Sequence, residues 1–176
     1  MSLQRYSLPA IILHWLQAAI VLWLLWLGWT MVDLPKGAER SAAYGLHKSM
    51  GLVALLLVTV RLIWRYRNPA PAPLGDGWEV RVAQLTHHLL YVFLLCAPLS
   101  AYLASSFGTY PLKFFGFEII KAGWPDEGIN AIFKLAHQVF VWGGAGLVAL
   151  HIAGALKHGL KGDGTVRRML PGRSVE

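Results

Sequence analysis

The sequence has little charge, few acidic residues and a single cysteine. Charged residues make up 14% of the 176 positions, against roughly a quarter in soluble domains. A chain with so few charges cannot cover a water-facing surface in the usual way, so an ordinary soluble enzyme and a disordered tail are poor interpretations. Cys96 has no partner for an internal disulfide, which excludes a disulfide-stapled scaffold. Hydrophobic residues reach 56%, and we therefore expect a membrane domain.

Four apolar stretches are long enough to cross a bilayer. A hydrocarbon core about 30 Å thick takes roughly 20 residues of helix. The stretches cover residues 9–31, 42–64, 82–105 and 131–157, and none of them contains Asp or Glu. Pro, Gly, Asp, Lys or Arg residues flank each one, as expected at helix ends. The sequence predicts an all-α fold: an integral membrane four-helix up-down bundle, with residues 1–176 forming a single transmembrane domain.

The basic residues are divided unequally between the two sides of this bundle. Of the 16 Lys and Arg residues, ten lie in or beside the N-terminal segment, the second connection and the C-terminal segment, and six lie on the other side. The positive-inside rule then places both termini in the cytoplasm. The net charge of +7 is explained by topology. We find no helix-turn-helix, zinc-finger or RNA-binding signature, so we expect no nucleic-acid partner.

The connection between the third and fourth spans, residues 107–130, is long and rich in aromatic residues. Aromatic side chains commonly form a layer at the membrane interface, which is one interpretation of this segment. The other interpretation is a cover over a functional site.

All seven histidines lie within a span or at its edge. An ionisable side chain is costly in the hydrocarbon region, so each one marks a candidate functional site. In the fourth span, His137, Gly144, His151 and His158 follow one another at seven-residue intervals, which is nearly two turns of helix and puts them on one face. His137 and His151 are therefore about 21 Å apart along the helix axis, one toward each side of the membrane.

Depth pairs two further histidines with these. His14 lies early in the first span, toward the cytoplasm, where it would face His151. His47 lies early in the second span, toward the outer side, where it would face His137. Two facing imidazoles at each of two levels can hold two porphyrin irons. A transporter of divalent metal ions should have carboxylates beside the histidines, which the spans lack. Because no Cys-x-x-Cys-His motif occurs, the haem would be b-type and not covalently attached.

Other residues of the second span fit the same hypothesis. Arg61 lies 14 residues after His47, on the same helix face at the cytoplasmic end, and its guanidinium group suits haem propionates. Gly28, Gly51 and Gly144 would leave room for large planar groups between helices, although small residues also serve ordinary helix packing.

Several short motifs resemble the bacterial cytochrome b561 family in order, spacing and membrane depth, over essentially the whole chain. The resemblance implies an inner-membrane cytochrome with two non-covalent haem b groups. In it, His14 with His151 and His47 with His137 are the axial ligands of the haem iron. The motifs are IILHWL at 11–16, GLHKSMG at 45–51, VRL at 60–62, HHLLY at 87–91, Ala97-Pro98, His137, Leu150-His151, His158 and LPGR at 170–173.

The resemblance also implies a reaction. Members of the family include a superoxide oxidase, so electrons would pass from superoxide, or another one-electron donor on the periplasmic side, to ubiquinone in the membrane quinone pool. Lys48, beside His47, and Lys134, near His137, would attract an anionic donor. The ordinary interpretation of these two residues is that they are interfacial lysines whose ammonium groups reach toward water.

Reduction of a quinone takes up protons, and histidine is the natural relay near neutral pH. His158, together with His87 and Arg61, would form the quinone-side pocket, while His88 has no assigned role. The runner-up function is a cytochrome b anchor subunit that exchanges quinol electrons with a partner dehydrogenase, hydrogenase or periplasmic protein. A non-redox transporter or structural bundle is the third class of function.

Overall fold

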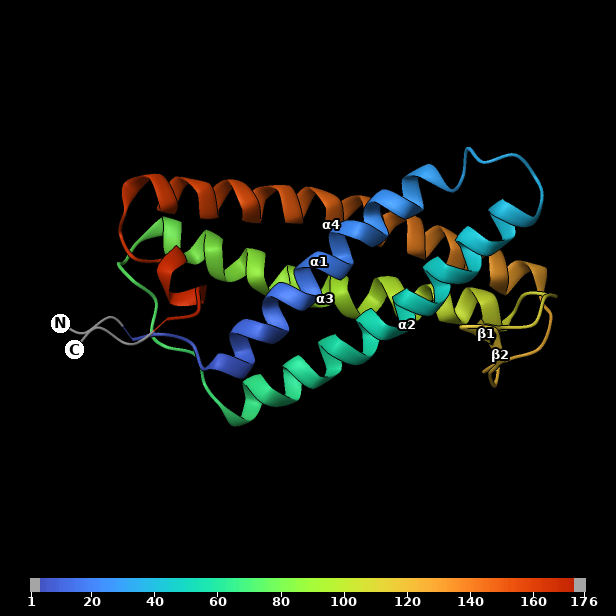
Figure 1. Ribbon diagram of the computed structural model, residues 1–176, viewed down its shortest axis with the longest axis horizontal. Coiled ribbons are helices and arrows are strands. Elements are labelled where there is room, and N and C mark those ends of the chain that lie inside the picture. Colours follow the sequence, from blue (N-terminus) through green and yellow to red (C-terminus); the bar gives the residue numbers. More distant parts are fainter. Residues whose placement is uncertain (1–3, 173–176) are drawn as a thin grey trace.

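Four long helices run side by side in the computed structural model, which describes residues 4–172 (Figure 1). All four are long and apolar enough to cross a membrane. Consecutive helices run in opposite directions (Figure 1), which confirms the expected all-α up-down membrane bundle. The helices are α1 (Leu8–Thr30), α2 (Ala38–Arg67), α3 (Trp78–Ser106) and α4 (Glu127–Lys161); a hairpin of β1 (Lys113–Phe114) and β2 (Phe117–Glu118) precedes α4, and a 3-10 helix η1 (Val166–Met169) follows it.

The helices extend beyond the apolar stretches. The second and fourth spans were expected to begin at residues 42 and 131, whereas α2 begins at Ala38 and α4 at Glu127. For α4 the start is set by Asp126, whose side chain accepts a hydrogen bond from the Ile129 backbone N–H at 2.9 Å. Its end is set by Gly162, which adopts a left-handed conformation with φ of 66°. Local capping, and not the end of hydrophobicity, therefore determines the length of α4.

The closest helix pair is α3 with α4, while α1 packs on α2 and α2 on α3. Gly144 lies at the α3–α4 contact, where a Cβ atom would overlap the ring of Phe93. Phe93 also packs with Val21 and Ala97 in the buried core. The backbones of α1 and α2 do not lie as close to the backbone of α4 as that of α3 does. Side chains therefore connect α4 to α1 and α2.

The β1–β2 hairpin defines one end of the bundle, called here the hairpin end. Its turn contains Phe115 with φ of 47° and Gly116 with φ of 95°, both left-handed. The backbone N–H of Phe115 donates a hydrogen bond to Ser49 Oγ at 2.9 Å. This bond fastens the hairpin to α2 two residues from His47. Part of the connection between α3 and α4 thus covers α2 beside His47, while Trp124 in the same connection stays exposed, as in an aromatic interface layer.

The opposite end, called here the η1 end, joins three segments that are far apart in the sequence. Arg168 is buried there and donates hydrogen bonds to the backbone oxygens of Gln4 at 2.8 Å and Ala72 at 2.9 Å. Its guanidinium group also lies over the ring of Tyr6. The segment before α1, the connection between α2 and α3, and η1 lie together at this end (Figure 1). The Arg168 side chain joins them, and we call these contacts the Arg168 clasp.

Candidate functional site

His47 of α2 and His137 of α4 face each other at the hairpin end. Their ring centroids are 6.4 Å apart, and the ring planes are inclined by 86°. His137 Nδ1 contacts the carbonyl oxygen of Ala97 at 2.8 Å. A carbonyl can only accept a hydrogen bond, so this nitrogen carries the proton and Nε2 of the neutral ring keeps its lone pair for a ligand bond. The α3 backbone therefore fixes the tautomer of His137.

His47 has no such partner. Its Nδ1 atom is buried and makes no hydrogen bond with the described residues 4–172. A buried unpaired ring nitrogen is costly unless another group satisfies it. Gly28 makes room for this ring, because a Cβ atom there would lie 3.0 Å from His47 Cε1. Gly28 of α1 thus leaves the space that the His47 ring of α2 fills.

His14 of α1 and His151 of α4 form the second pair, at the η1 end. Their ring centroids are 6.0 Å apart, with planes inclined by 74°. His87 of α3 lies against the other partner, with its ring centroid 5.2 Å from that of His151. The sequence analysis grouped His87 with His158. The structure places His87 beside the His14–His151 pair.

Arg61 belongs to this pair as well. Its Nη2 atom donates a hydrogen bond to His14 Nδ1 at 3.0 Å, and its guanidinium group lies 5.4 Å from the ring centre of Tyr91. A neutral imidazole that binds a metal through Nε2 carries its proton on Nδ1, so it cannot accept this bond. Metal binding by His14 through Nε2 therefore requires Arg61 to release the ring and turn to another acceptor. A carboxylate is the acceptor that a guanidinium group binds best.

In both pairs the distance between the ring centroids is that expected of two imidazoles that bind one metal ion from opposite sides. Two imidazoles on opposite sides of one metal ion have ring centroids roughly 6 Å apart, because each metal–nitrogen bond is about 2 Å long and the nitrogen lies about 1 Å from the ring centre. Within residues 4–172, no group of three or more His, Cys, Asp or Glu side chains could hold a metal ion, so the donor sets are pairs. Two neutral imidazoles without a carboxylate suit an iron porphyrin bound on both faces. The residues present fit such a cofactor at both levels.

Three lysines gather near the His47–His137 pair. The ammonium group of Lys48, the residue after His47, is half-buried and is repelled by the charges of Lys134 and Lys121. Lys121 Nζ is also held by the carbonyl oxygen of Gly108 at 2.5 Å. The hairpin end thus presents concentrated positive charge beside one histidine pair. Lys121 lies in the long connection before α4, whose path could not be read from the sequence.

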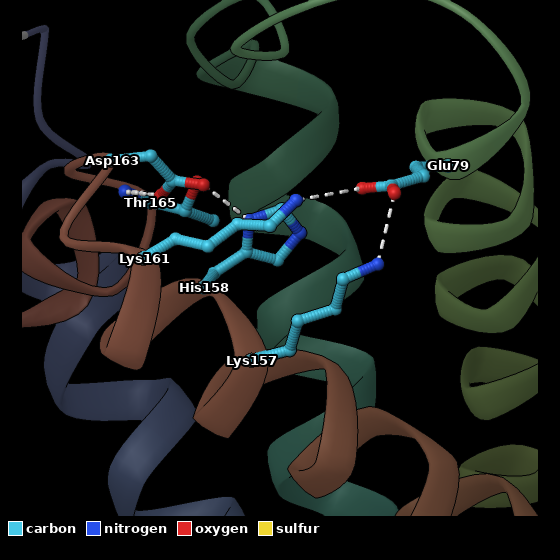
Figure 2. A network of polar contacts seen from close by, with 6 residues as sticks. All are labelled: Glu79, Lys157, His158, Lys161, Asp163 and Thr165. Carbon is cyan, nitrogen blue, oxygen red and sulfur yellow. Dashed lines mark hydrogen bonds and ion pairs between the residues drawn. The ribbon is translucent and has the colours of Figure 1, made fainter.

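His158 lies beyond both pairs, near the end of α4 (Figure 2). Its Nδ1 atom donates a hydrogen bond to Asp163 Oδ2 at 2.5 Å, and Asp163 Oδ1 accepts one from the Thr165 backbone N–H at 3.0 Å. These bonds, that from His158 first, lower the pKa of Asp163 to about 2. The carboxylate is therefore ionised throughout the physiological range. His158 and Asp163 form a hydrogen-bonded pair that is separate from His87 and Arg61.

A second ion pair flanks this one. Glu79 at the start of α3 binds Lys157 Nζ at 2.9 Å and Lys161 Nζ at 3.7 Å (Figure 2). The residues are exposed, so the pair contributes little to stability. Glu79 nevertheless binds both Lys157 and Lys161, the two lysines in the last turns of α4 beside His158.

Sequence reasoning missed two functional contacts. Asp163 lies in a Gly-Asp-Gly turn five residues after His158, and a carboxylate in the turn that ends a histidine-bearing helix could have indicated it. The Ala97 carbonyl gives no side-chain signal. Only the following Pro98, which cannot donate a backbone hydrogen bond, marks that stretch of α3 as unusual.

A membrane-spanning four-helix bundle with two pairs of facing imidazoles defines a membrane cytochrome that transfers electrons. The sequence pattern of one family, prokaryotic cytochrome b561, matches residues 5–172. The chain belongs to this family, whose members bind b-type haem, and the resemblance noted in the sequence is confirmed. As its composition indicates, it is a multi-pass membrane protein.

Individual relatives cover nearly the whole chain. Cytochrome b561 homolog 2 of Escherichia coli K12 is 34% identical over 172 residues, which is 95% of this chain and 92% of the relative. Cytochrome b561 homolog 1 of the same organism is 31% identical over 182 residues, 97% of this chain and 99% of the relative. A protein named probable superoxide oxidase CybB, from Yersinia pestis, is 25% identical over 174 residues, 96% and 97% of the two chains.

Proposed function

We propose that the protein transfers electrons across the bacterial inner membrane, from superoxide on the periplasmic side to ubiquinone. The observation that carries this proposal is the presence of two imidazole pairs at opposite ends of one bundle, with ring separations of 6.0 and 6.4 Å. The name of the Yersinia pestis relative supports superoxide as the donor. In this orientation the hairpin end is periplasmic, and both termini are cytoplasmic.

Each pair is proposed to hold one haem b without a covalent bond. His47 and His137 would hold the haem at the hairpin end, and His14 and His151 would hold the haem at the η1 end. Bound haem supplies reversible one-electron chemistry. With a histidine on each side, each pair would leave no open position at the metal for oxygen species. Arg61, once released from His14, is the residue that would bind a propionate.

The lysines of the hairpin end are proposed to attract the donor. Superoxide is an anion, and the field of Lys48, Lys121 and Lys134 raises its local concentration beside the His47–His137 pair. Each superoxide ion loses one electron and becomes oxygen. Two such ions are therefore needed for each quinone that is reduced to quinol.

The η1 end is proposed to supply the protons. Reduction of a quinone to a quinol takes up two protons. His158 can deliver them one at a time from Nε2, taking up a proton from water between the two transfers, while Nδ1 stays bonded to Asp163. The ionised carboxylate holds the ring in one tautomer and steadies the charge that the ring carries after it is reprotonated from water.

Two measurements on the purified protein test the proposal. A reduced-minus-oxidised spectrum should show b-type haem at two per chain, and a colourless protein from haem-replete cells would exclude any cytochrome function. Superoxide and a soluble ubiquinone should then give quinol faster than the spontaneous reaction. If the rate stays at the spontaneous value and a redox subunit co-purifies, the protein is an anchor subunit and the superoxide proposal fails.

A further inference from the structure

A cavity of about 470 Å³ lies at the η1 end, between the start of α1 and the end of α2. Four arginines line it: Arg5, Arg61, Arg65 and Arg67. No Asp or Glu is among the lining residues. None of the four forms an ion pair with a carboxylate within residues 4–172, where the acidic partners are Glu79 and Asp163. We call this cavity the arginine pocket.

One atom of the pocket is buried without a partner. Arg5 Nη1 donates to the carbonyl oxygen of Leu170 at 3.3 Å, but Arg5 Nε is buried and makes no hydrogen bond to the described residues. A guanidinium N–H that is withdrawn from water without an acceptor is unfavourable. Arg61 is proposed to bind a propionate, which leaves Arg5, Arg65 and Arg67 as cations without a carboxylate. Together with the buried free donor of Arg5, they indicate an anionic ligand with several acceptor oxygens.

The walls of the pocket are fixed. Trp64 Nε1 donates to Ser7 Oγ at 3.1 Å and joins the end of α2 to the segment before α1. Tyr6, another lining residue, stacks on Arg168 of the clasp, and its backbone N–H donates to the Arg168 carbonyl oxygen at 3.2 Å. Asn68, Pro69 and Pro71 form the remaining wall, and the prolines stiffen it. The arginines thus line a space whose other walls are held in place by these contacts.

The position of the pocket indicates which kind of anion it binds. It lies where two membrane-spanning helices end, which is the level of lipid headgroups. Tyr6, Trp64 and Tyr91 line it together with the arginines. Amphipathic aromatic rings of this kind prefer the membrane interface. Of the four arginines, Arg61 contacts the His14–His151 pair, whereas Arg65 and Arg67 are exposed beyond it.

We propose that the arginine pocket binds the phosphate headgroup of an acidic phospholipid. The guanidinium groups of Arg65 and Arg67 bind phosphate oxygens, Arg5 Nε donates to a third, and the acyl chains leave along the apolar surface of α1 and α2. This inference is independent of the proposed reaction, because it uses no redox chemistry. It predicts that the protein keeps an acidic lipid through purification.

Native mass spectrometry of the full-length haem-loaded protein tests the proposal. Cardiolipin and phosphatidylglycerol should bind at least tenfold more tightly than phosphatidylcholine, and inorganic phosphate should not compete at millimolar concentration. Arg65→Gln combined with Arg67→Gln should weaken acidic-lipid binding about tenfold. Both arginines are exposed and make no side-chain hydrogen bond within residues 4–172, so the variant should fold. Arg81→Gln, at the same end of the bundle but outside the pocket, is the matched control and should bind as the unmodified protein does.

Four results would overturn the proposal. Equal binding of phosphatidylcholine would mean that headgroup charge is not recognised. Competition by inorganic phosphate at the affinity of the lipid would mean that the pocket takes a soluble anion. Loss of haem in the Arg65 and Arg67 variant, read from its absorption spectrum, would assign the pocket to the cofactor. Arg5→Gln provides a second variant, and full lipid retention in both variants would also contradict the assignment.

Discussion

His137 Nδ1 donates a 2.8 Å hydrogen bond to the carbonyl oxygen of Ala97 across the α3–α4 interface. This bond ties a proposed ligand to the most closely packed pair of helices in the bundle. His47, its partner, belongs to α2 and lacks an equivalent bond among the described residues. The His137 ring is therefore fixed by the α3 backbone, whereas the His47 ring is oriented only by what it binds.

Replacing one histidine of a pair should remove one haem and leave the other. His151→Ala should lower the haem content from two to one per chain, because the η1-end site loses an axial ligand, and His137→Ala should do the same at the hairpin end. Haem is quantified by the pyridine haemochrome spectrum. His88→Ala is the control with both haems retained, since the His88 ring bonds only the Gln84 backbone within residues 4–172. Two intact spectral components in His151→Ala would show that the pairing is wrong.

Arg61 should tune the potential of one site. Arg61→Gln keeps a hydrogen-bond donor but removes a positive charge next to His14. A nearby cation favours the reduced state, so the variant should lower the midpoint potential of the η1-end haem by several tens of millivolts, where about 59 mV is a tenfold change in a one-electron equilibrium. Spectroelectrochemical titration measures this value. An unchanged potential at that haem, or an equal shift at both, would show that Arg61 does not act there.

The three lysines of the hairpin end should control the rate with superoxide. Lys48→Gln combined with Lys134→Gln should slow superoxide-driven haem reduction about tenfold, because electrostatic attraction to the site is lost. The remaining rate should also depend less on ionic strength. Stopped-flow absorbance at several salt concentrations gives both quantities. Lys36→Gln, in the first outer connection, should react like the unmodified protein. A rate unaffected by the double substitution would mean that the lysines only anchor the interface.

Two neighbouring glycines should respond in opposite ways to the same change. Gly144→Ala should destabilise the protein by about 1–3 kcal/mol because the added methyl group overlaps the Phe93 ring. Gly143→Ala should be neutral or stabilising by up to about 1 kcal/mol, because nothing lies within 4 Å of its Cβ position and alanine favours helix. Thermal unfolding in detergent compares the two. Equal effects would mean that Phe93 moves aside without cost.

The stability supplied by Asp163 should be lost only in strong acid. Its folded pKa of about 2 is below its ordinary value of 3.8. A carboxyl group with a depressed folded pKa stabilises the folded state above its unfolded pKa, and this contribution disappears as the pH falls through the folded pKa. The Tm difference between the protein and Asp163→Asn should therefore be constant from pH 7 to 5 and shrink between about pH 4 and 2. Measurement in a non-ionic detergent tests this. A difference that shrinks near pH 6 would contradict the assignment.

The sequence predicted the bundle and the facing of the histidines because both depend on position along the chain. Apolar length predicts a span, and seven-residue spacing predicts a shared face, so His14 meets His151 and His47 meets His137 in the fold. The side-chain contacts of individual histidines could not be predicted from apolar length or residue spacing. The sequence analysis placed His87 and His158 in one pocket, yet His87 packs on His151 and His158 binds Asp163.

The other contacts that the sequence did not predict share one physical cause. The Ser49–Phe115 bond joins residues 66 positions apart, and the approach of Gly28 to His47 depends on how α1 crosses α2. Neither the crossing of helices nor the path of a long connection leaves a periodic signal in the sequence. Arg61 illustrates the same limit, since its depth was predicted but its contact with His14 was not.

The Arg168 clasp also sets an order of assembly. Arg168 follows α4, yet it holds the backbone of Gln4, 164 positions earlier in the chain. The ribosome must therefore deliver all four helices to the membrane before the segment ahead of α1 can take its final place. Until then, the η1 end, with its histidine pair and the arginine pocket, lacks the contacts of the clasp. Cofactor and lipid can therefore reach this end before the clasp forms.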